Sequence, residues 1–246
     1  MDVEAERINP YQGDQREKTQ QVRAMFDNIA PAYDFMNRAM TFGIDKLWRA
    51  KAVRLIGRQS PKEILDVASG TGDLAILLAR RIPGASILGV DLSKGMLQLG
   101  ERKVAEAGLA DRVSFSVADC MRLPMPDDTF DCVSVAYGVR NFQNLLAGYK
   151  EMYRVLRPGG MLCVIELSTP DSKLVLPFYR FYTKCVIPAV RRMISKDVRA
   201  YSYLPESIAA VPKGSEMLSL ISEAGFREPR FRRLTFGVCT IYTAFK

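Results

Sequence analysis

Hydrophobic residues change their spacing near residue 60. Between residues 19 and 57 they recur every three or four positions, a spacing that predicts helices. Pro31 is expected to divide this region into two helices, because a proline inside a helix removes a hydrogen bond. We therefore predict a helical cap over residues 21–60, preceded by a polar, mobile tail over residues 1–20.

From residue 60 onward, short apolar runs alternate with helical segments. This alternation is typical of a doubly wound α/β fold, in which a mostly parallel sheet carries helices on both faces. The five strands predicted in this part are Glu63–Ala68, Ser86–Asp91, Val113–Ala118, Phe130–Tyr137 and Met161–Leu167. The three helices predicted between them are Asp73–Ile82, Ser93–Ala107 and Asn144–Leu156.

The pattern changes again toward the end of the chain. A turn is expected at Pro158-Gly159-Gly160, just before the fifth strand. Residues 171–211 lack the alternation and are rich in aromatic and basic side chains, so we predict an inserted helical lid there. A helix at Ser215–Ala224 precedes two strand-like segments, Phe231–Phe236 and Cys239–Phe245. We expect these to form an antiparallel hairpin that completes a seven-stranded sheet within one domain.

The histidine and cysteine content narrows the chemistry. The 246 residues include no histidine, which excludes a histidine metal ligand, acid or base, and we expect no metal site. The five cysteines form no Cys-x-x-Cys pair, and an odd number without an apolar leader favours a reducing, cytoplasmic location. No apolar stretch reaches the length of a transmembrane helix.

The net charge of +8 comes from the last third of the chain. Residues 1–172 hold 22 basic and 22 acidic side chains, whereas residues 173–246 hold 13 basic and 5 acidic ones. Such a basic region suits an anionic membrane surface or a nucleic acid, and equally a solvated surface. Charge alone does not choose between these interpretations.

The strongest local signal is the glycine loop that follows the first predicted strand. Small residues, Ser69, Gly70, Thr71 and Gly72, lead from this strand into a helix and let a ligand approach the backbone. Asp91 ends the next strand, where its carboxylate can accept hydrogen bonds from the hydroxyls of a ribose. The same spacing fits the dinucleotide fingerprint, so an NAD-dependent oxidoreductase is an alternative.

Carboxylates around this loop favour a cationic ligand. Asp73 opens the helix after the loop, where a pyrophosphate would meet a like charge, and Asp66 adds to the negative field. S-adenosylmethionine has no phosphate and carries a sulfonium and an ammonium group, so it suits this site better than NAD. Asp119 ends the third strand, where it can bind the adenine amino group while the N–H of Cys120 meets the ring.

The loop after the fourth strand, residues 136–141, is expected to face the transferred methyl group. It lacks the acidic residue or asparagine, two prolines and aromatic residue that are common in methyltransferases of nucleic-acid amino groups. Cys132 falls in mid-strand, where burial makes a thiol inert, which disfavours a cysteine-dependent cytosine methyltransferase. We expect no nucleic-acid partner, and an RNA methyltransferase that uses the basic last third is the less favoured alternative.

From about residue 22 to its end, the chain resembles the ubiquinone/menaquinone biosynthesis C-methyltransferase family. The three runs most specific to that family contain Tyr33, Arg140 and Tyr201. The matching runs are FDNIAPAYDFMN (26–37), FGIDKLW (42–48), LDVASGTGDL (65–74), YGVRNF (137–142), YRVLRPGG (153–160), YSYLPESI (201–208) and LTFGV (234–238).

The resemblance implies a Rossmann-like class I methyltransferase that uses S-adenosylmethionine to methylate a ring carbon of a prenylated quinol. Members of the family convert demethylmenaquinol to menaquinol or methylate the 2-polyprenyl-6-methoxybenzoquinol precursor of ubiquinone, and we favour demethylmenaquinol. The resemblance also implies that Thr71, Asp91, Asp119 and Cys120 contact the cofactor. Ala136 stands where many relatives have a serine, so one hydroxyl contact is missing.

A quinol carbon becomes nucleophilic when the neighbouring phenol, whose free pKa is about 10, loses its proton. Because histidine is absent, Arg140 is the residue predicted to stabilise the phenolate, and Tyr33 is the second predicted catalytic residue. Further candidates to position the substrate hydroxyls are Asp34, Asn141, Glu166 and Tyr201.

The segment Leu174–Ile194 combines apolar and aromatic residues with four basic ones. One interpretation is core packing under a lid. The other is docking on anionic lipid at the inner face of the membrane, with entry of the prenyl tail, since basic amphipathic helices lie in that interface. The tail length and the oligomeric state, including a homo-oligomer, are left open by the sequence.

Overall fold

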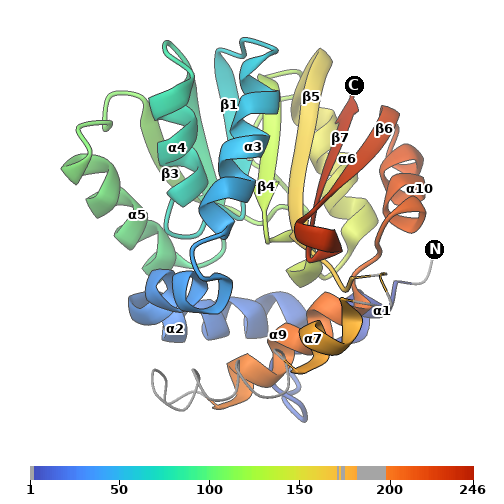
Figure 1. Ribbon diagram of the computed structural model, residues 1–246. Helices are drawn as coiled ribbons and strands as arrows, with labels where there is room; N and C mark the ends of the chain where they lie inside the picture. Colours follow the sequence, from blue (N-terminus) through green and yellow to red (C-terminus); the bar gives the residue numbers. More distant parts are fainter. Residues whose placement is uncertain (1–2, 171, 173–174, 182–197) are drawn as a thin grey trace.

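The computed structural model describes residues 3–170, 172, 175–181 and 198–246. A seven-stranded sheet runs through it in the order β3-β2-β1-β4-β5-β7-β6 (Figure 1). β1 to β5 pair in parallel, whereas β7 pairs antiparallel with both β5 and β6, so the mostly parallel sheet and its closing hairpin are confirmed. The strands are β1 (Glu63–Val67), β2 (Ser86–Asp91), β3 (Val113–Val117), β4 (Phe130–Ala136), β5 (Leu156–Leu167), β6 (Arg227–Leu234) and β7 (Cys239–Phe245).

Helices cover both faces of the sheet and one of its ends (Figure 1). One face carries α3 (Asp45–Gly57), α4 (Asp73–Arg81) and α5 (Lys94–Glu106), and the other carries α6 (Leu145–Val155) and α10 (Ser215–Glu223). The end where the parallel strands have their carboxyl termini is covered by α1 (Glu4–Arg7), α2 (Lys18–Thr41), η1 (Val139–Asn141), α7 (Leu176–Phe181), α9 (Val198–Ala210) and η3 (Thr235–Gly237). Ligands of open α/β sheets bind at this end.

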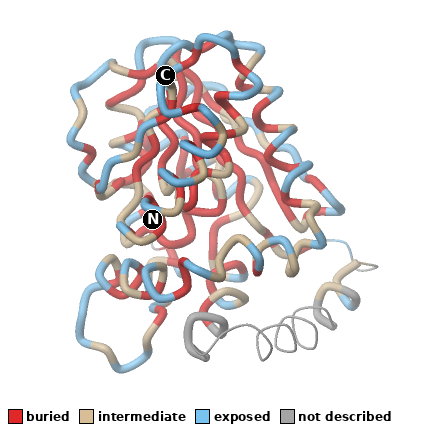
Figure 2. The backbone as a smooth tube through the Cα atoms, turned by 90° about the vertical axis from the view of Figure 1, so that its left-hand side faces the viewer, coloured by how far each residue is buried: buried red, intermediate tan, exposed pale blue. Residues whose placement is uncertain are grey.

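The core consists of two apolar layers on either side of the sheet. Successive residues of a strand point to opposite faces, so Leu65 and Val67 join the layer under α6 and α10, whereas Ile64 joins the layer under α3 and α4. Figure 2 shows buried residues concentrated along the central strands and exposed residues along the outer loops. Burial on both faces explains why the strands are nearly continuous apolar runs in the sequence.

The N-terminal region differs from its sequence prediction. α2 continues through Pro31 without a break, because burial of its apolar face, including Met25, outweighs a local cost of about 3 kcal/mol. The residues before α2 are packed against the domain: Val3 and Ala5 are buried, and the Lys18 ammonium donates to the carbonyl oxygen of Ala5. The predicted helix break is therefore wrong, and the described residues before α2 lie against the domain.

The turn predicted before the fifth strand is also different. β5 already begins at Leu156, and its register against β4 shifts between Phe130 and Cys132. The glycine-containing segment is thus an irregularity inside the strand, with Gly159 at a φ of 82°. The N–H of Gly159 donates to the carbonyl oxygen of Lys246 at 2.9 Å, which attaches this segment to the C-terminal residue.

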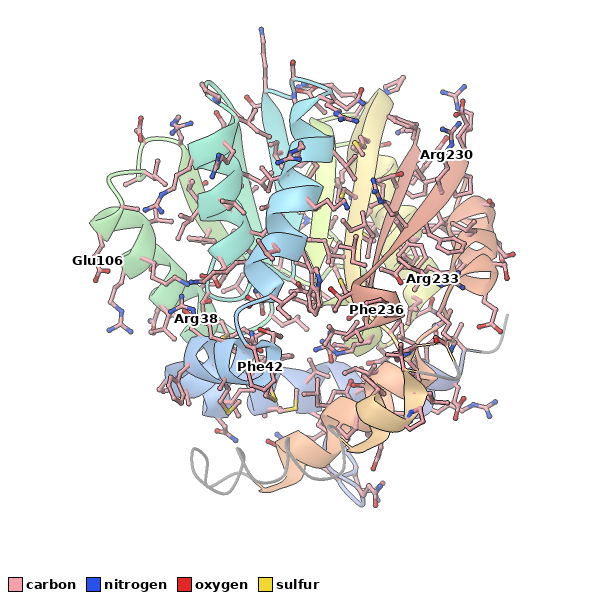
Figure 3. The ribbon with its side chains drawn as sticks, in the orientation of Figure 1. Arg38, Phe42, Glu106, Arg230, Arg233 and Phe236 are labelled. Atoms are coloured by element: carbon pink, nitrogen blue, oxygen red, sulfur yellow. The ribbon has the colours of Figure 1, made fainter. Side chains whose placement is uncertain are left out.

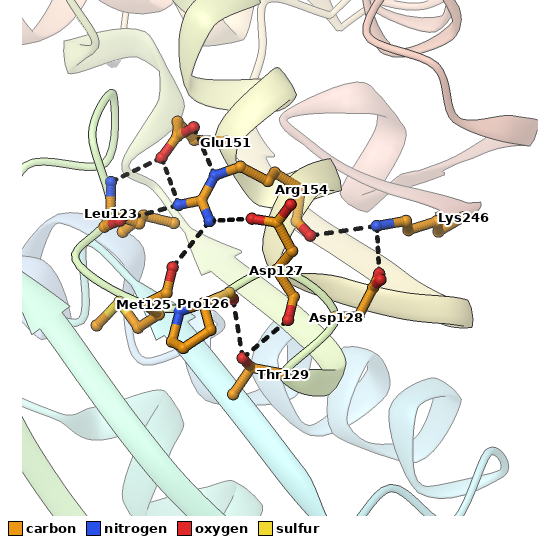
Figure 4. Close-up of polar contacts among 9 residues, drawn as sticks. All are labelled: Leu123, Met125, Pro126, Asp127, Asp128, Thr129, Glu151, Arg154 and Lys246. Atoms are coloured by element: carbon orange, nitrogen blue, oxygen red, sulfur yellow. Dashed lines mark hydrogen bonds and ion pairs between the residues drawn. The ribbon is translucent and has the colours of Figure 1, made fainter.

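At the amino-terminal end of the parallel strands, Arg154 joins the end of α6 to the loop before β4 (Figure 4). Its guanidinium donates two hydrogen bonds to Glu151, at 2.9 and 2.8 Å, and one to Asp127 at 2.7 Å. It also donates to the carbonyl oxygens of Leu123 at 2.9 Å and Met125 at 2.8 Å. Three of these five hydrogen bonds therefore attach the loop to α6, at the end of the sheet opposite the glycine loop.

The helical additions are described in part. Within the predicted cap, α2 crosses the end of the sheet, whereas α3 packs on a face beside α4. Within the predicted lid, α7 and α9 are described, and most of Leu174–Ile194 lies outside the described residues. No helix in the described part of the chain is long and apolar enough to cross a membrane.

Candidate active site

A cavity lies where β1, β2, β3 and β4 end, beside α2. We call it the glycine-loop cavity. Asp91 and Asp119 are its charged residues, and no lysine or arginine of the described chain lines it. The lining residues are Thr19, Val22, Phe26, Tyr33, Ala68, Gly70, Val90, Asp91, Leu92, Met96, Ala118, Asp119, Cys120, Met121, Ala136, Tyr137, Gly138, Asn141, Phe142 and Gln143.

Backbone geometry places Asp91 on the wall of this cavity. Its carboxylate accepts hydrogen bonds from the N–H groups of Gly70 and Ser93, each at 2.9 Å. Burial raises the pKa of Asp91, and the bonds from backbone N–H groups act in the opposite direction. The carboxylate thus connects the glycine loop to the end of β2.

Four of the seven predicted cofactor residues line the cavity: Gly70, Asp91, Asp119 and Cys120. Asp119 accepts a hydrogen bond from the N–H of Met121 at 2.9 Å, which orients its carboxylate. Burial raises the pKa of the Cys120 thiol well above its usual value, so the thiol stays protonated.

The other three, Ser69, Thr71 and Gly72, do not line the cavity. The Ser69 hydroxyl donates to Asp66 at 2.7 Å, and the Thr71 hydroxyl donates to Asp34 at 2.6 Å. Gly72 has a φ of 76°, and a Cβ atom there would lie 2.6 Å from the Phe115 ring.

These three residues therefore stabilise the conformation of the glycine loop through contacts outside the cavity.

The role predicted for Asp73 is corrected by its surroundings. Its carboxylate forms an ion pair with Lys103 and lies 3.8 Å from the guanidinium of Arg49. Although burial opposes the shift, these two cations lower the pKa of Asp73. Asp73 does not line the glycine-loop cavity, so its compensated charge is not what a ligand meets there. The negative wall is formed by Asp91 and Asp119 instead.

A second cavity, lined mainly by apolar side chains, lies between α2, α3, α7, α9 and η3. We call it the apolar cavity. Tyr33 and Tyr137 line both cavities, so the two adjoin along these side chains. The other residues of the apolar cavity are Asn37, Met40, Thr41, Phe42, Ile44, Asp45, Trp48, Arg49, Arg140, Leu167, Val175, Tyr179, Leu204, Ile208, Thr235, Phe236 and Val238.

Arg140 lines the apolar cavity and is 6% exposed. Its guanidinium donates to Glu166 at 2.7 Å and to the carbonyl oxygen of Tyr137. Although burial opposes the shift, Glu166 raises the pKa of Arg140, so the guanidinium stays charged. Glu166 was expected to touch the substrate, but it lines neither cavity and holds Arg140 instead.

Four buried side-chain atoms near this junction have no hydrogen-bond partner among the described residues. They are Tyr137 Oη, Arg140 Nε, Asn141 Oδ1 and Tyr203 Oη. Each of these residues lines a cavity that Tyr33 also lines. Because most buried polar atoms in proteins are paired, and an unpaired one costs about 1–3 kcal/mol, this group indicates a site for a polar ligand.

The remaining predicted residues differ in their surroundings. Tyr33 is at the centre of the site, and burial raises its pKa. Asp34 forms an ion pair with Lys103 at 2.8 Å and lines neither cavity. The side chain of Tyr201 lies outside the described part of the chain. Sequence reasoning missed Tyr137 and Tyr203, although both belong to the runs that carry the family resemblance.

The seven-stranded sheet with this cavity at its carboxyl end is the α/β fold of class I S-adenosylmethionine-dependent methyltransferases. A solved methyltransferase of that class from Thermotoga maritima, titled a possible histamine N-methyltransferase, matches with a TM-score of 0.64 and 18% identity, covering 91% of this chain and 99% of that one. The model of the ubiE/COQ5 methyltransferase family matches residues 14–246, and the chain belongs to this family.

Curated relatives match over most or all of the chain. A protein of Bacteroides fragilis named demethylmenaquinone methyltransferase is 47% identical over 246 residues, which is 100% of both chains. A protein of Geobacter sulfurreducens named ubiquinone/menaquinone biosynthesis C-methyltransferase UbiE is 45% identical and covers 94% of this chain and 90% of its own length.

Proposed function

We propose that this chain is an S-adenosylmethionine-dependent C-methyltransferase that converts demethylmenaquinol to menaquinol. Membership of a methyltransferase family and the full-length similarity to a demethylmenaquinone methyltransferase support this assignment. The structural observation that carries it is the junction of an acidic cavity and an apolar cavity, with unpaired polar atoms gathered beside it.

The glycine-loop cavity suits the methyl donor. Bound S-adenosylmethionine supplies an electrophilic methyl group on a sulfonium. A cationic ligand without phosphate fits a wall that has two carboxylates and no basic side chain among the described residues. Asp91 would bind the ribose hydroxyls with the lone pairs that its two backbone bonds leave free, and Asp119 would bind the adenine amino group beside Cys120. Gly70 lets the donor approach the backbone.

The apolar cavity suits the acceptor. A prenylated quinol combines a ring bearing two hydroxyls with a long hydrocarbon tail. The tail would occupy the part of the cavity lined by residues such as Met40, Trp48 and Leu204. The ring would lie at the end lined by Tyr33 and Arg140, where polar atoms of the described residues lack hydrogen-bond partners.

Arg140 has the properties required to activate such a ring. Glu166 holds the Arg140 guanidinium in a buried position, and its Nε–H, which has no partner among the described residues, would donate a charge-assisted hydrogen bond to an adjacent phenolate. Because the pKa of Arg140 is raised, the guanidinium remains protonated and acts as an electrostatic stabiliser rather than as the base. Tyr33, which lines both cavities, would hold donor and acceptor in register.

The mouth of the apolar cavity would meet lipid. Phe42 and Phe236 line this cavity, are 75% and 79% exposed, and adopt φ angles of 51° and 56° (Figure 3). Exposure and a left-handed backbone are both costly for phenylalanine, which points to an interaction function. Exposed Arg38 and Arg233 lie near them in the sequence and suit an anionic membrane surface.

Co-sedimentation with vesicles tests this contact. The chain should bind vesicles that contain anionic lipid, and Phe42→Ser with Phe236→Ser should lower the bound fraction several-fold. Equal binding of this double variant and the parent chain would exclude these phenylalanines as the lipid contact.

A methyl-transfer assay tests the reaction itself. The purified chain is incubated with labelled S-adenosylmethionine and either reduced demethylmenaquinol or the 2-polyprenyl-6-methoxybenzoquinol precursor. We expect label on the ring carbon of the naphthoquinol. Transfer to the benzoquinol alone would favour the ubiquinone pathway, and transfer to neither would overturn the assignment.

A further inference from the structure

Tyr137 stands out at the junction of the two cavities because its backbone is strained and its ring is held in place. It has a φ of 60°, which a bulky non-glycine residue rarely adopts. Its N–H donates to the carbonyl oxygen of Ile165 at 2.7 Å, and its own carbonyl accepts from Arg140. The Arg49 guanidinium lies 5.2 Å from the ring centroid, and the Trp48 ring lies 6.5 Å away.

The hydroxyl at the end of this ring is the unusual part. Tyr137 is 8% exposed, and its Oη has no partner among the described residues. Burial raises its pKa well above the usual value, so the group stays a neutral hydroxyl that can both donate and accept. A phenylalanine would fill the same space without this cost, so the hydroxyl is expected to find its partner in a ligand.

We infer that the Tyr137 hydroxyl binds the second hydroxyl of the quinol ring, the one para to the phenol that Arg140 stabilises. This inference rests on the proposed function. Tyr137 and Arg140 line the same cavity, and the backbone carbonyl of Tyr137 accepts a hydrogen bond from the Arg140 guanidinium, so the guanidinium is attached to the residue that carries the hydroxyl. A ring bound at both oxygens presents one edge to the donor, which makes Tyr137 a specificity-determining residue.

The other unpaired hydroxyl is less suited to this role. Tyr203 lines a smaller cavity between α2 and α9, together with Arg140 and Asn141, and it lines neither the glycine-loop cavity nor the apolar cavity. It therefore lies on the Arg140 side of the site. Tyr137 is the unpaired tyrosine that lines both the cavity assigned to the donor and the cavity assigned to the acceptor.

Tyr137→Phe removes only the hydroxyl, and Tyr149→Phe is its matched control. The Tyr149 hydroxyl is also buried, but it is paired with the sulfur of Met217 at 3.2 Å in the layer under α10. We expect Tyr137→Phe to leave the melting temperature unchanged or higher while kcat/KM for demethylmenaquinol falls about 10- to 100-fold. Tyr149→Phe should lower the melting temperature and leave kcat/KM within about twofold.

A second acceptor separates hydrogen bonding to the ring from a general structural effect. This acceptor is a prenylated 1-naphthol that keeps the phenol beside the methylated carbon and lacks the second hydroxyl. The parent chain should use it less efficiently than the quinol. Tyr137→Phe should then cause at most about a twofold further loss, because the group that Tyr137 binds is already absent.

The outcomes distinguish the inference from the proposed function. An equal loss with both acceptors, or no loss with either, would overturn the role of Tyr137 while the methyltransferase assignment stands. A parent chain that methylates neither acceptor would overturn the assignment, and the inference with it.

Discussion

The two ends of the parallel sheet differ in how completely their buried and half-buried charged groups are hydrogen-bonded. At the amino-terminal end, Arg154 makes five hydrogen bonds to four residues (Figure 4). At the carboxyl end, Arg140 is more deeply buried, yet its guanidinium has two hydrogen bonds and its Nε has no partner among the described residues.

Carboxylates show the same contrast. Asp131, at the start of β4, accepts hydrogen bonds from the N–H groups of Lys62 and Glu63 and from Arg157, and these outweigh burial and lower its pKa. Asp66, in β1 near the glycine loop, accepts from Ser69 and Ser134, but burial raises its pKa to about 6. One end of the sheet is built for stability, whereas the other keeps polar groups incompletely paired, as expected of a site that completes its bonds with ligands.

The largest expected effect is the loss of turnover on removal of Arg140. Arg140→Ala should lower kcat for methyl transfer about 100- to 1000-fold, because the phenolate loses its stabilising charge. Arg140 does not line the glycine-loop cavity, so calorimetry should give a dissociation constant for S-adenosylmethionine within about threefold of the parent value. Unchanged turnover would remove Arg140 from the mechanism.

Arg154→Ala should lower the stability of the fold and leave turnover unchanged. Loss of five hydrogen bonds around a side chain that is 30% exposed should lower the free energy of unfolding by about 2–3 kcal/mol, measured by urea denaturation. Turnover per folded molecule should be unchanged, since Arg154 lies at the far end of the sheet. A large loss of kcat in a fully folded variant would contradict the division between the two ends.

Asp66 should make stability depend on pH. Its pKa is about 6 in the folded chain, against 3.8 as its ordinary value, so between these pH values the folded chain binds more protons than the unfolded chain. Its contribution to the free energy of unfolding therefore falls by about 2–3 kcal/mol as pH rises from about 4 to 6.

Asp66→Asn provides the measurement. The free energy of unfolding of the parent chain, minus that of the variant, should decrease by this amount between pH 4 and pH 7. A constant difference across this range would show that folding leaves the pKa of Asp66 unchanged, and an increasing difference would show that folding lowers it.

The smallest expected effect concerns Asp73. Because its charge is compensated by Lys103 and it lies off the cavity wall, Asp73→Asn should change the dissociation constant of S-adenosylmethionine by no more than about twofold. Asp119→Asn, which alters the wall itself, should weaken binding about tenfold. Equal effects of the two variants in calorimetry would restore the role that the sequence suggested for Asp73.

These cases show which features the sequence can predict. Strands such as Ser86–Asp91 and Cys239–Phe245 were predicted with the bounds that the structure gives them, because an apolar run buried on both faces depends on local composition. The glycine loop and Asp91 were placed correctly at the carboxyl end for a similar reason, since the strand order of α/β folds brings them together.

The errors depend on contacts between segments that are distant in the sequence. Lys103 in α5 compensates Asp73, and Glu166 at the end of β5 holds Arg140; neither pair is visible in a local pattern. Pro31 does not break α2, because packing of this helix against the domain outweighs the low helix propensity of proline. Unpaired hydroxyls such as that of Tyr137 could not have been predicted, because a missing partner is a property of the whole fold.

The shared tyrosine wall has a kinetic consequence. Tyr33 and Tyr137 lie between the glycine-loop cavity, which has two carboxylates, and the apolar cavity. Under the proposed function, the water-soluble donor and the lipid-soluble acceptor would each exchange on their own side. A spent donor would then be replaced while the hydrocarbon tail of the acceptor stays bound.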